Sequence, residues 1–275
     1  MAISIMRLLR GTPVVPVVRL TGPIGISTPF SSSITLANTA KLLDRAFAMK
    51  HAKAIALVIN SPGGSAVQSH LIYQRIRMLK KENDKKVIAF VEDVAASGGY
   101  MIACAADEII VDPSSIVGSI GVISASFGFE KAIKKLGVER RVHTAGSHKM
   151  SLDPFQREKP DDVRRLKAIQ QDIHELFIGL VKKSRGRKLK GREKTLFSGE
   201  FWGGGKAVQY GLADRLGEIK SVLRERYGKK VETPLIAPPT GWLSKKTPGI
   251  GLDADLASGL ISAMEARALW SRYGL

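Results

Sequence analysis

Three short segments combine serine, lysine and glycine in a pattern that could support acyl transfer. Residues 95–100 (AASGGY) carry Ser97 directly after a predicted strand at 86–92. Small neighbours on both sides would leave the Ser97 hydroxyl open to a substrate carbonyl, and the N–H of Gly98 could stabilise the oxyanion formed on attack. A helix N-cap explains a serine here equally well, but it does not explain the two glycines that follow, because glycine weakens a helix start.

The second segment is 60–64 (NSPGG), at the end of the predicted buried strand 53–60. Its two glycines let the backbone approach another group closely and turn N–H groups outward. Such preorganised donors are what an oxyanion hole requires, which makes Gly64 a candidate. Taken alone, the segment is more simply explained as a tight turn.

A serine nucleophile needs a neighbouring base. None of the five histidines lies between Ser97 and His143, although His143 and His148 remain possible bases. The third segment, 145–151 (AGSHKMS), places Lys149 52 residues after Ser97. A lysine can act as a base where burial lowers its pKa toward neutrality, although most lysines are solvated surface groups.

The bulk composition is that of an ordinary globular chain with a large excess of positive charge. In 275 residues there are 43 Lys and Arg against 25 Asp and Glu, a formal charge of +18. This favours anionic partners such as nucleic acid or acidic lipid headgroups, although a solvated basic surface explains it equally well. The basic stretch 182–194 has no interleaved aromatic residues, so no specific nucleic-acid partner is expected.

Cellular location can be approached from cysteine content and hydropathy. The single cysteine, Cys104, excludes an intramolecular disulfide framework and fits a reducing compartment. No run of about 20 apolar residues is present, as a membrane-spanning helix would require. Residues 2–9 could form a short amphipathic helix lying on a membrane. We therefore expect a cytoplasmic protein with peripheral contact to an anionic membrane.

Predicted strands and helices alternate along the chain, which indicates βαβ crossovers and a mainly parallel α/β sheet. The stretch 233–251 is rich in Pro and Gly and is typical of a linker, and an amphipathic helix is expected at about 252–270. We therefore predict a main domain at 1–230 and a C-terminal part at 231–275. The other expected strands are 13–20, 53–60, 86–92, 108–112, 118–124 and 139–144, and the other expected helices are 38–49, 66–80, 97–106, 127–136, 161–184 and, interrupted at its glycines, 206–226.

The run from ALVINSPGGS through VIAFVEDVAASGGYMIACAADEIIVDPSSIVGSIGVI resembles the core of the signal peptide peptidase A family, over about residues 14–226. In that family the serine of ASGGY is the nucleophile and the lysine of a downstream G-x-x-K segment is the base, which implies these roles for Ser97 and Lys149. The resemblance also implies that Ser119 hydrogen-bonds the lysine and that Gly64 and Gly98 supply the oxyanion donors.

The same resemblance implies a Clp protease/crotonase-type fold with repeated ββα units around a mainly parallel sheet, and C-terminal helices after it. It implies a serine endopeptidase that acts on signal peptides or other short or unfolded peptides and needs no cofactor or metal. The chain resembles a short, single-copy form without a membrane anchor, so we expect a ring-shaped homo-oligomer.

Two other functions remain open at this stage. A hydratase of coenzyme-A thioesters could share the fold, but it would normally carry site carboxylates, and no Glu occupies a comparable place. A catalytically silent scaffold could use the positive charge to bind membranes or acidic partners.

Overall fold

The computed structural model describes residues 11–26, 33–237 and 252–275, and the side chains of the last stretch from residue 262. The described chain divides into two compact units. Unit 1 comprises Met1–Ile120 with Ile178–Leu275, and unit 2 comprises Gly121–Phe177. The predicted division at residues 230 and 231 follows a different boundary and stays a prediction.

Unit 1 is built on a seven-stranded sheet with the order β1-β2-β3-β4-β7, in which β5 pairs with β3 and with β6. All neighbouring strands run parallel except β5 and β6, which are antiparallel. The predicted parallel α/β class is therefore confirmed. The strands are β1 (Val17–Thr21), β2 (Ile55–Ser61), β3 (Val87–Ala96), β4 (Glu108–Val111), β5 (Ile116–Gly118), β6 (Phe201–Gly203) and β7 (Arg215–Leu216).

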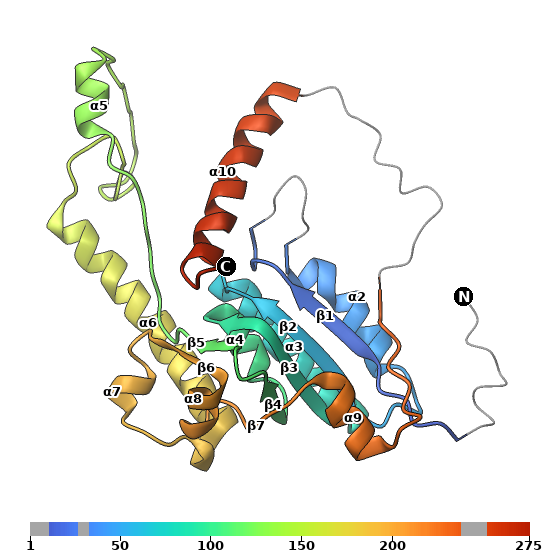
Figure 1. The fold of residues 1–275 in the computed structure, drawn as a ribbon. Coiled ribbons are helices and arrows are strands. Elements are labelled where there is room, and N and C mark those ends of the chain that lie inside the picture. The colour runs from blue at the N-terminus through green and yellow to red at the C-terminus, as the bar shows by residue number, and fades with distance from the viewer. Residues whose placement is uncertain (1–10, 27–32, 238–251) are drawn as a thin grey trace. The chain divides into compact units, whose positions relative to one another are not determined.

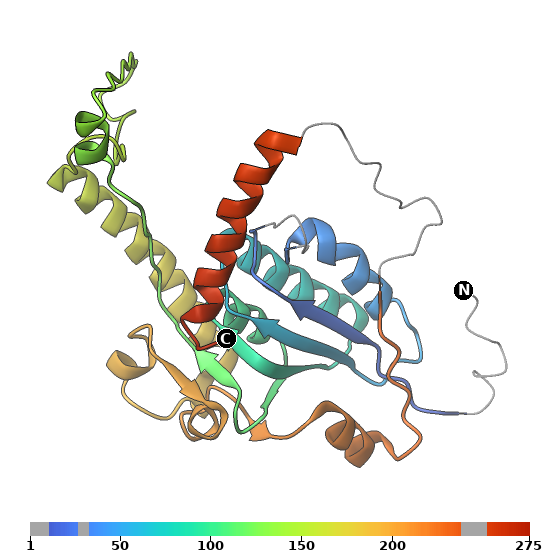
Figure 2. The ribbon, with the colours of Figure 1, turned by 45° about the horizontal axis from the view of Figure 1, so that its top comes forward.

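Helices cover both faces of this sheet (Figures 1 and 2). Helices α2 (Leu36–Phe47), α3 (Ala66–Asn83) and α4 (Gly98–Ala103) pack on one face. On the other, Val222 and Leu223 of α9 (Ile219–Tyr227) pack in one cluster with Ala56 and Val58 of β2. Burial on both faces explains why β2 reads as a continuous apolar run. The remaining helices are α5 (Glu130–Lys135), α6 (Pro160–Arg185), a 3₁₀ turn (Gly186–Lys188), α7 (Glu193–Leu196), α8 (Gly204–Gln209) and α10 (Leu252–Ser271).

Three expectations about local structure are wrong or incomplete. The strand expected at 118–124 overlaps β5 only at Gly118, and residues 119–124 form no strand. The strand expected at 139–144 is an exposed irregular segment of unit 2, where Arg140 and Arg141 form ion pairs and no strand of the described chain lies alongside to complete a ladder. The interrupted helix expected at 206–226 is two helices, α8 and α9, with β7 between them. Strand β6 was not expected, because three residues carry no readable alternation. The helix expected at 2–9 lies outside the described residues.

A buried ion pair ties the end of α6 to the segment before β7. Arg185 is 3% exposed, and its guanidinium binds the Asp214 carboxylate at 2.7 Å and the Gly211 carbonyl at 2.8 Å. Asp214 also accepts from Lys188 at 2.6 Å and from the N–H of Ile109 at 2.7 Å. Burial by itself would raise the pKa of Asp214, but hydrogen bonds from these three groups hold it below the ordinary value.

We expect Asp214→Ala to lower the free energy of unfolding by about 3–5 kcal/mol, because Arg185 would keep a buried charge without its counter-ion. Lys188→Ala is the matched control. Its side chain is half exposed, so its loss should cost under about 1 kcal/mol. The pKa of Asp214 is lower in the folded protein than in the unfolded chain. The stabilisation should therefore be fully present at pH values above the ordinary aspartate pKa, and it should be lost as the pH falls through the lowered pKa of Asp214. Urea unfolding of the three proteins measures both effects, and equal losses in the two variants would contradict the expectation.

Candidate active site

Ser97 lies where β3 ends and α4 begins, in a backbone conformation that L-residues rarely adopt. Its φ is +52° and its ψ is −120°, although the residue is not a glycine. Strained backbone of this kind at the end of a strand is typical of positions whose side chain must be presented in a fixed direction. Ser97 is partly exposed, and its hydroxyl makes no capping hydrogen bond to α4. Ser97 therefore occupies the N-cap position of α4, but its side chain does not cap the helix.

The NSPGG turn packs directly against Ser97. A Cβ atom on Gly63 would lie 2.7 Å from the Cβ of Ser97 and 3.0 Å from the nitrogen of Gly98. A Cβ on Gly99 would lie 2.6 Å from the carbonyl oxygen of Ser61. Contacts this short leave no room for any side chain, so the glycines of the two segments are needed for backbone-to-backbone approach. Sequence reasoning did not single out Gly63, because only the folded turn brings it to the serine.

The two predicted oxyanion donors, Gly64 and Gly98, both border this contact. Gly64 has φ +138° and forms an isolated parallel β-bridge with Ile24. In this bridge the N–H of Ile24 donates to the carbonyl of Gly63, and the N–H of Ser65 donates to the carbonyl of Ile24. In a parallel bridge of this kind, the N–H of Gly64 points away from Ile24. Gly98 is the first residue of α4, where an N–H has no partner within the helix. Neither N–H donates to another group in the part of the chain that the structure describes, and their role as oxyanion donors stays a prediction.

Ser119 is held beside Ser97 by strand register. Strands β3 and β5 run parallel with Ala96 opposite Gly118, so the two serines follow paired residues on neighbouring strands. The N–H of Ser97 donates to the carbonyl of Gly118 at 2.8 Å. Ser119 is 5% exposed, also has φ +52°, and its hydroxyl makes no hydrogen bond within the described part of the chain. The structure therefore brings together Ser97, Ser119 and the glycine turn.

Strand β6 and the C-terminal segment border the same region. The N–H of Ser119 donates to the carbonyl of Glu200 at 2.7 Å, and the ring of Trp202 lies against Gly118. Tyr273 is 7% exposed, packs on Val94 and Ala96 at the end of β3, and lies edge-to-face with Phe201 at 5.0 Å. Its hydroxyl lies 3.4 Å from the carbonyl of Pro62 in the NSPGG turn. No sequence pattern near residue 273 indicated this contact.

Lys149 belongs to unit 2, within a turn where its N–H donates to the carbonyl of Gly146 at 3.2 Å. Ser151 closes this turn by donating to the carbonyl of His148 at 2.9 Å, and it also bonds the carboxylate of Asp162 at 3.1 Å. Lys149 and His148 are both exposed in this unit. Groups outside the turn must therefore surround the Lys149 ammonium if it is to act as a base, and its pairing with Ser97 stays a prediction.

A reactive cysteine, a metal site and a membrane-spanning helix can each be looked for among the described residues. Cys104 is buried, and burial raises the pKa of its thiol to about 12, so it stays a neutral thiol at ordinary pH. Within residues 11–26, 33–237 and 252–275, no three His, Cys, Asp or Glu side chains gather as a metal site would require. In the same ranges no helix combines the length and apolar character needed to cross a bilayer.

Comparison with known proteins identifies the family and the fold. The profile of peptidase family S49 matches residues 79–231, and that of the ClpP-like SDH-type serine proteinases matches residues 3–141. A 1510-N membrane-bound stomatin-specific protease, solved as a lysine-to-alanine mutant in complex with a substrate peptide, superposes with a TM-score of 0.51 at 19% identity, over 92% of this chain and 99% of that one. The fold is thus the ClpP-like fold that was expected.

Three relatives with similar sequences carry different functional names. The Na(+)/H(+) antiporter NhaA of Brucella abortus is 57% identical over 95% of this chain and 37% of that protein. The chloroplastic serine protease SPPA of Arabidopsis thaliana is 31% identical over 85% and 35%, and Protease 4 of Haemophilus influenzae is 36% identical over 68% and 30%. The chain spans about a third of the length of these relatives.

The S49 match covers more than half of the chain and contains the candidate nucleophile, the candidate base and Ser119. The ClpP-like match adds the NSPGG turn, which packs against that nucleophile. The chain belongs to serine peptidase family S49.

Proposed function

We propose that this protein is a serine endopeptidase of the signal peptide peptidase A type, working through a Ser97–Lys149 dyad and an acyl-enzyme. The observation that carries the proposal is the packing of the NSPGG turn against a strained, partly exposed Ser97, with Ser119 beside it. A purely structural serine would need neither the strain nor the two glycine pairs.

In the proposed reaction, Lys149 removes the hydroxyl proton of Ser97 as its oxygen attacks the scissile carbonyl. The N–H groups of Gly64 and Gly98 hold the resulting oxyanion. Lys149 then gives the proton to the leaving amine as the C–N bond breaks, which leaves an ester on Ser97. Water, deprotonated by the same lysine, attacks this ester and releases the second product. The Ser119 hydroxyl hydrogen-bonds the amine of Lys149 and orients it.

We assign short or unfolded peptides, including signal peptides, as the substrate class. Two observations support this: relatives across most of the chain are named as proteases, and the family match includes all three candidate residues. The Brucella abortus relative is named as an antiporter, but the match covers only 37% of that protein. The peptidase profile, in contrast, matches residues 79–231 of this chain. The peptidase assignment therefore follows this chain's own residues.

Cleavage of a peptide library by the purified protein tests this function. We expect hydrolysis at internal bonds with wild-type protein and none with Ser97→Ala prepared in the same way. Turnover of acyl-CoA thioesters without peptide cleavage would favour the hydratase alternative. If the protein neither turns over these two substrate classes nor reacts with acylating probes, the scaffold alternative is favoured.

We further propose that the protein assembles into a homo-oligomeric ring. Unit 2 carries large apolar side chains that are mostly exposed, among them Phe127 at 81%, Leu136 at 76% and Ile123 at 67%. Exposed apolar groups in such number are typical of contact surfaces. We expect light scattering at micromolar concentration to show a single oligomer, and Phe127→Ser with Leu136→Ser to shift it toward smaller species. A monodisperse wild-type monomer would contradict the ring.

A further inference from the structure

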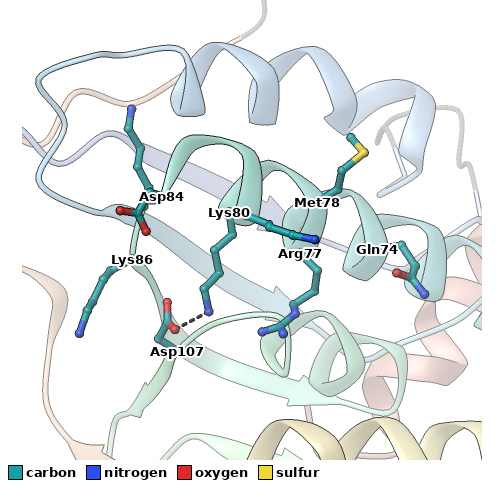
Figure 3. A pocket seen from close by; sticks show the side chains of 9 residues that line it. Gln74, Arg77, Met78, Lys80, Asp84, Lys86 and Asp107 are labelled. Atoms are coloured by element: carbon teal, nitrogen blue, oxygen red, sulfur yellow. Dashed lines mark hydrogen bonds and ion pairs between the residues drawn. The ribbon is translucent and has the colours of Figure 1, made fainter.

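A pocket of about 590 Å³ lies at the end of α3 and has no role in the proposed reaction. Helix α3 contributes most of its lining, the turn that follows contributes the next part, and Asp107, directly before β4, completes it (Figure 3). The lining consists of five cationic side chains, two carboxylates and two uncharged residues: Gln74, Arg77, Met78, Lys80, Lys81, Asp84, Lys85, Lys86 and Asp107.

Two of the five cations are engaged in holding the fold. The ammonium of Lys80 pairs with the Asp107 carboxylate, whose other oxygen accepts from the N–H of Val87. The ammonium of Lys85 donates to the carbonyls of Phe47 and Met49 at 2.7 Å each, at and just after the end of α2. These contacts explain a lysine at each of the two positions without any ligand.

The other three cations, Arg77, Lys81 and Lys86, have no such partner. None of them makes an ion pair or side-chain hydrogen bond with the part of the chain that the structure describes, and the one carboxylate left in the lining is the exposed Asp84. Lysines near a helix C-terminus also offset the helix dipole, but that effect is confined to the last turn. Arg77 lies a full turn earlier, and Lys86 lies beyond the helix.

The pocket and the candidate active site lie at opposite ends of the same elements. Lys86 directly precedes β3 and Ser97 directly follows it, which separates them by ten strand residues, or roughly 33 Å. Helix α3 likewise begins beside the NSPGG turn at Ser65 and reaches the pocket in its last turns. A ligand in this pocket would therefore leave Ser97 open to substrate.

We propose that this pocket binds a phosphate-bearing anion. A guanidinium recognises phosphate through paired N–H donors, as Arg77 would do here, and Lys81 and Lys86 add mobile positive charge elsewhere in the lining. The volume has room for a phosphorylated group larger than phosphate itself. A soluble phosphate compound and a phospholipid headgroup present the same chemistry to the pocket. The proposal does not depend on the chemistry assigned to Ser97.

The test compares the full-length wild-type protein with two triple variants that lose the same charge. The pocket variant is Arg77→Gln with Lys81→Gln and Lys86→Gln. The control variant is Lys220→Gln with Lys229→Gln and Lys230→Gln, which changes exposed lysines at and just after α9, on the other face of the sheet. Thermal unfolding first confirms that all three proteins are folded.

Binding is then measured by calorimetric titration with inorganic pyrophosphate and by flotation with phosphatidylglycerol vesicles, with phosphatidylcholine vesicles as the neutral reference. We expect the pocket variant to bind at least one anionic probe about tenfold or more weakly than the wild type, and the control variant to change by less than about threefold. Pyrophosphate binding identifies a soluble ligand, whereas binding to phosphatidylglycerol alone identifies a headgroup. Equal losses in both variants, or no binding to either probe, would overturn the proposal. Peptide cleavage is assayed in parallel and should be equal in all three proteins.

Discussion

Replacement of Ser97 by alanine is expected to lower kcat for peptide hydrolysis by about 10⁶-fold, the loss typical of removing the nucleophile from a catalytic unit. The physical reason is local, because the NSPGG turn, the strained backbone and the parallel register of β5 all converge on this one hydroxyl. Alanine keeps the Cβ that packs beside Gly63, so the fold should survive. Steady-state kinetics on a peptide found in the library screen measures the effect.

Ser114→Ala is the matched control, because Ser114 is an exposed serine in the turn between β4 and β5 and has no part in the proposed reaction. It should retain wild-type kinetics. Ser119→Ala should fall between the two, since Ser119 acts only through the lysine that it orients. Full activity in Ser97→Ala would end the nucleophile assignment.

Lys149→Met is expected to abolish turnover while leaving the protein folded. The lysine is exposed within unit 2, so its truncation removes no packing there. Lys149→Arg should be equally inactive, because arginine stays protonated in proteins and cannot accept the proton of a serine. Single-turnover kinetics on an activated ester would show whether acylation itself is lost, as a missing base requires.

The neighbouring histidine supplies the control for this prediction. His148 is one residue away, is equally exposed and is the alternative base on the same turn. His148→Ala should keep nearly wild-type activity. If His148→Ala is inactive and Lys149→Met is active, the dyad is wrong and a histidine mechanism must replace it.

Much of the fold could be predicted from the sequence because its elements are locally encoded. Continuous apolar runs such as Ile55–Ser61 can be buried only between two helical layers, and helices with a regular apolar spacing supply those layers. The juxtaposition of NSPGG with Ser97 became apparent only in the structure, where both segments end neighbouring parallel strands.

What the sequence did not reveal depends on partners distant along the chain. The segment 139–144 was expected to be a strand, but its sequence cannot show whether a neighbouring strand is present to pair with it. Gly63 was overlooked beside Gly64 because its role follows from its packing against Ser97, where a Cβ atom on Gly63 would lie 2.7 Å from the Cβ of Ser97. The approach of Tyr273 to Pro62 joins residues 211 positions apart, and no local signal marks such a pair.

The central claim, that Ser97 is the nucleophile, is tested most directly by covalent labelling. The purified protein is treated with a serine-directed acylating or phosphonylating probe, digested, and mapped by mass spectrometry. We predict one adduct, on the peptide that contains Ser97, with labelling lost in Ser97→Ala and strongly slowed in Lys149→Met. An adduct on another serine, or equal labelling of wild-type protein and Ser97→Ala, would contradict the account.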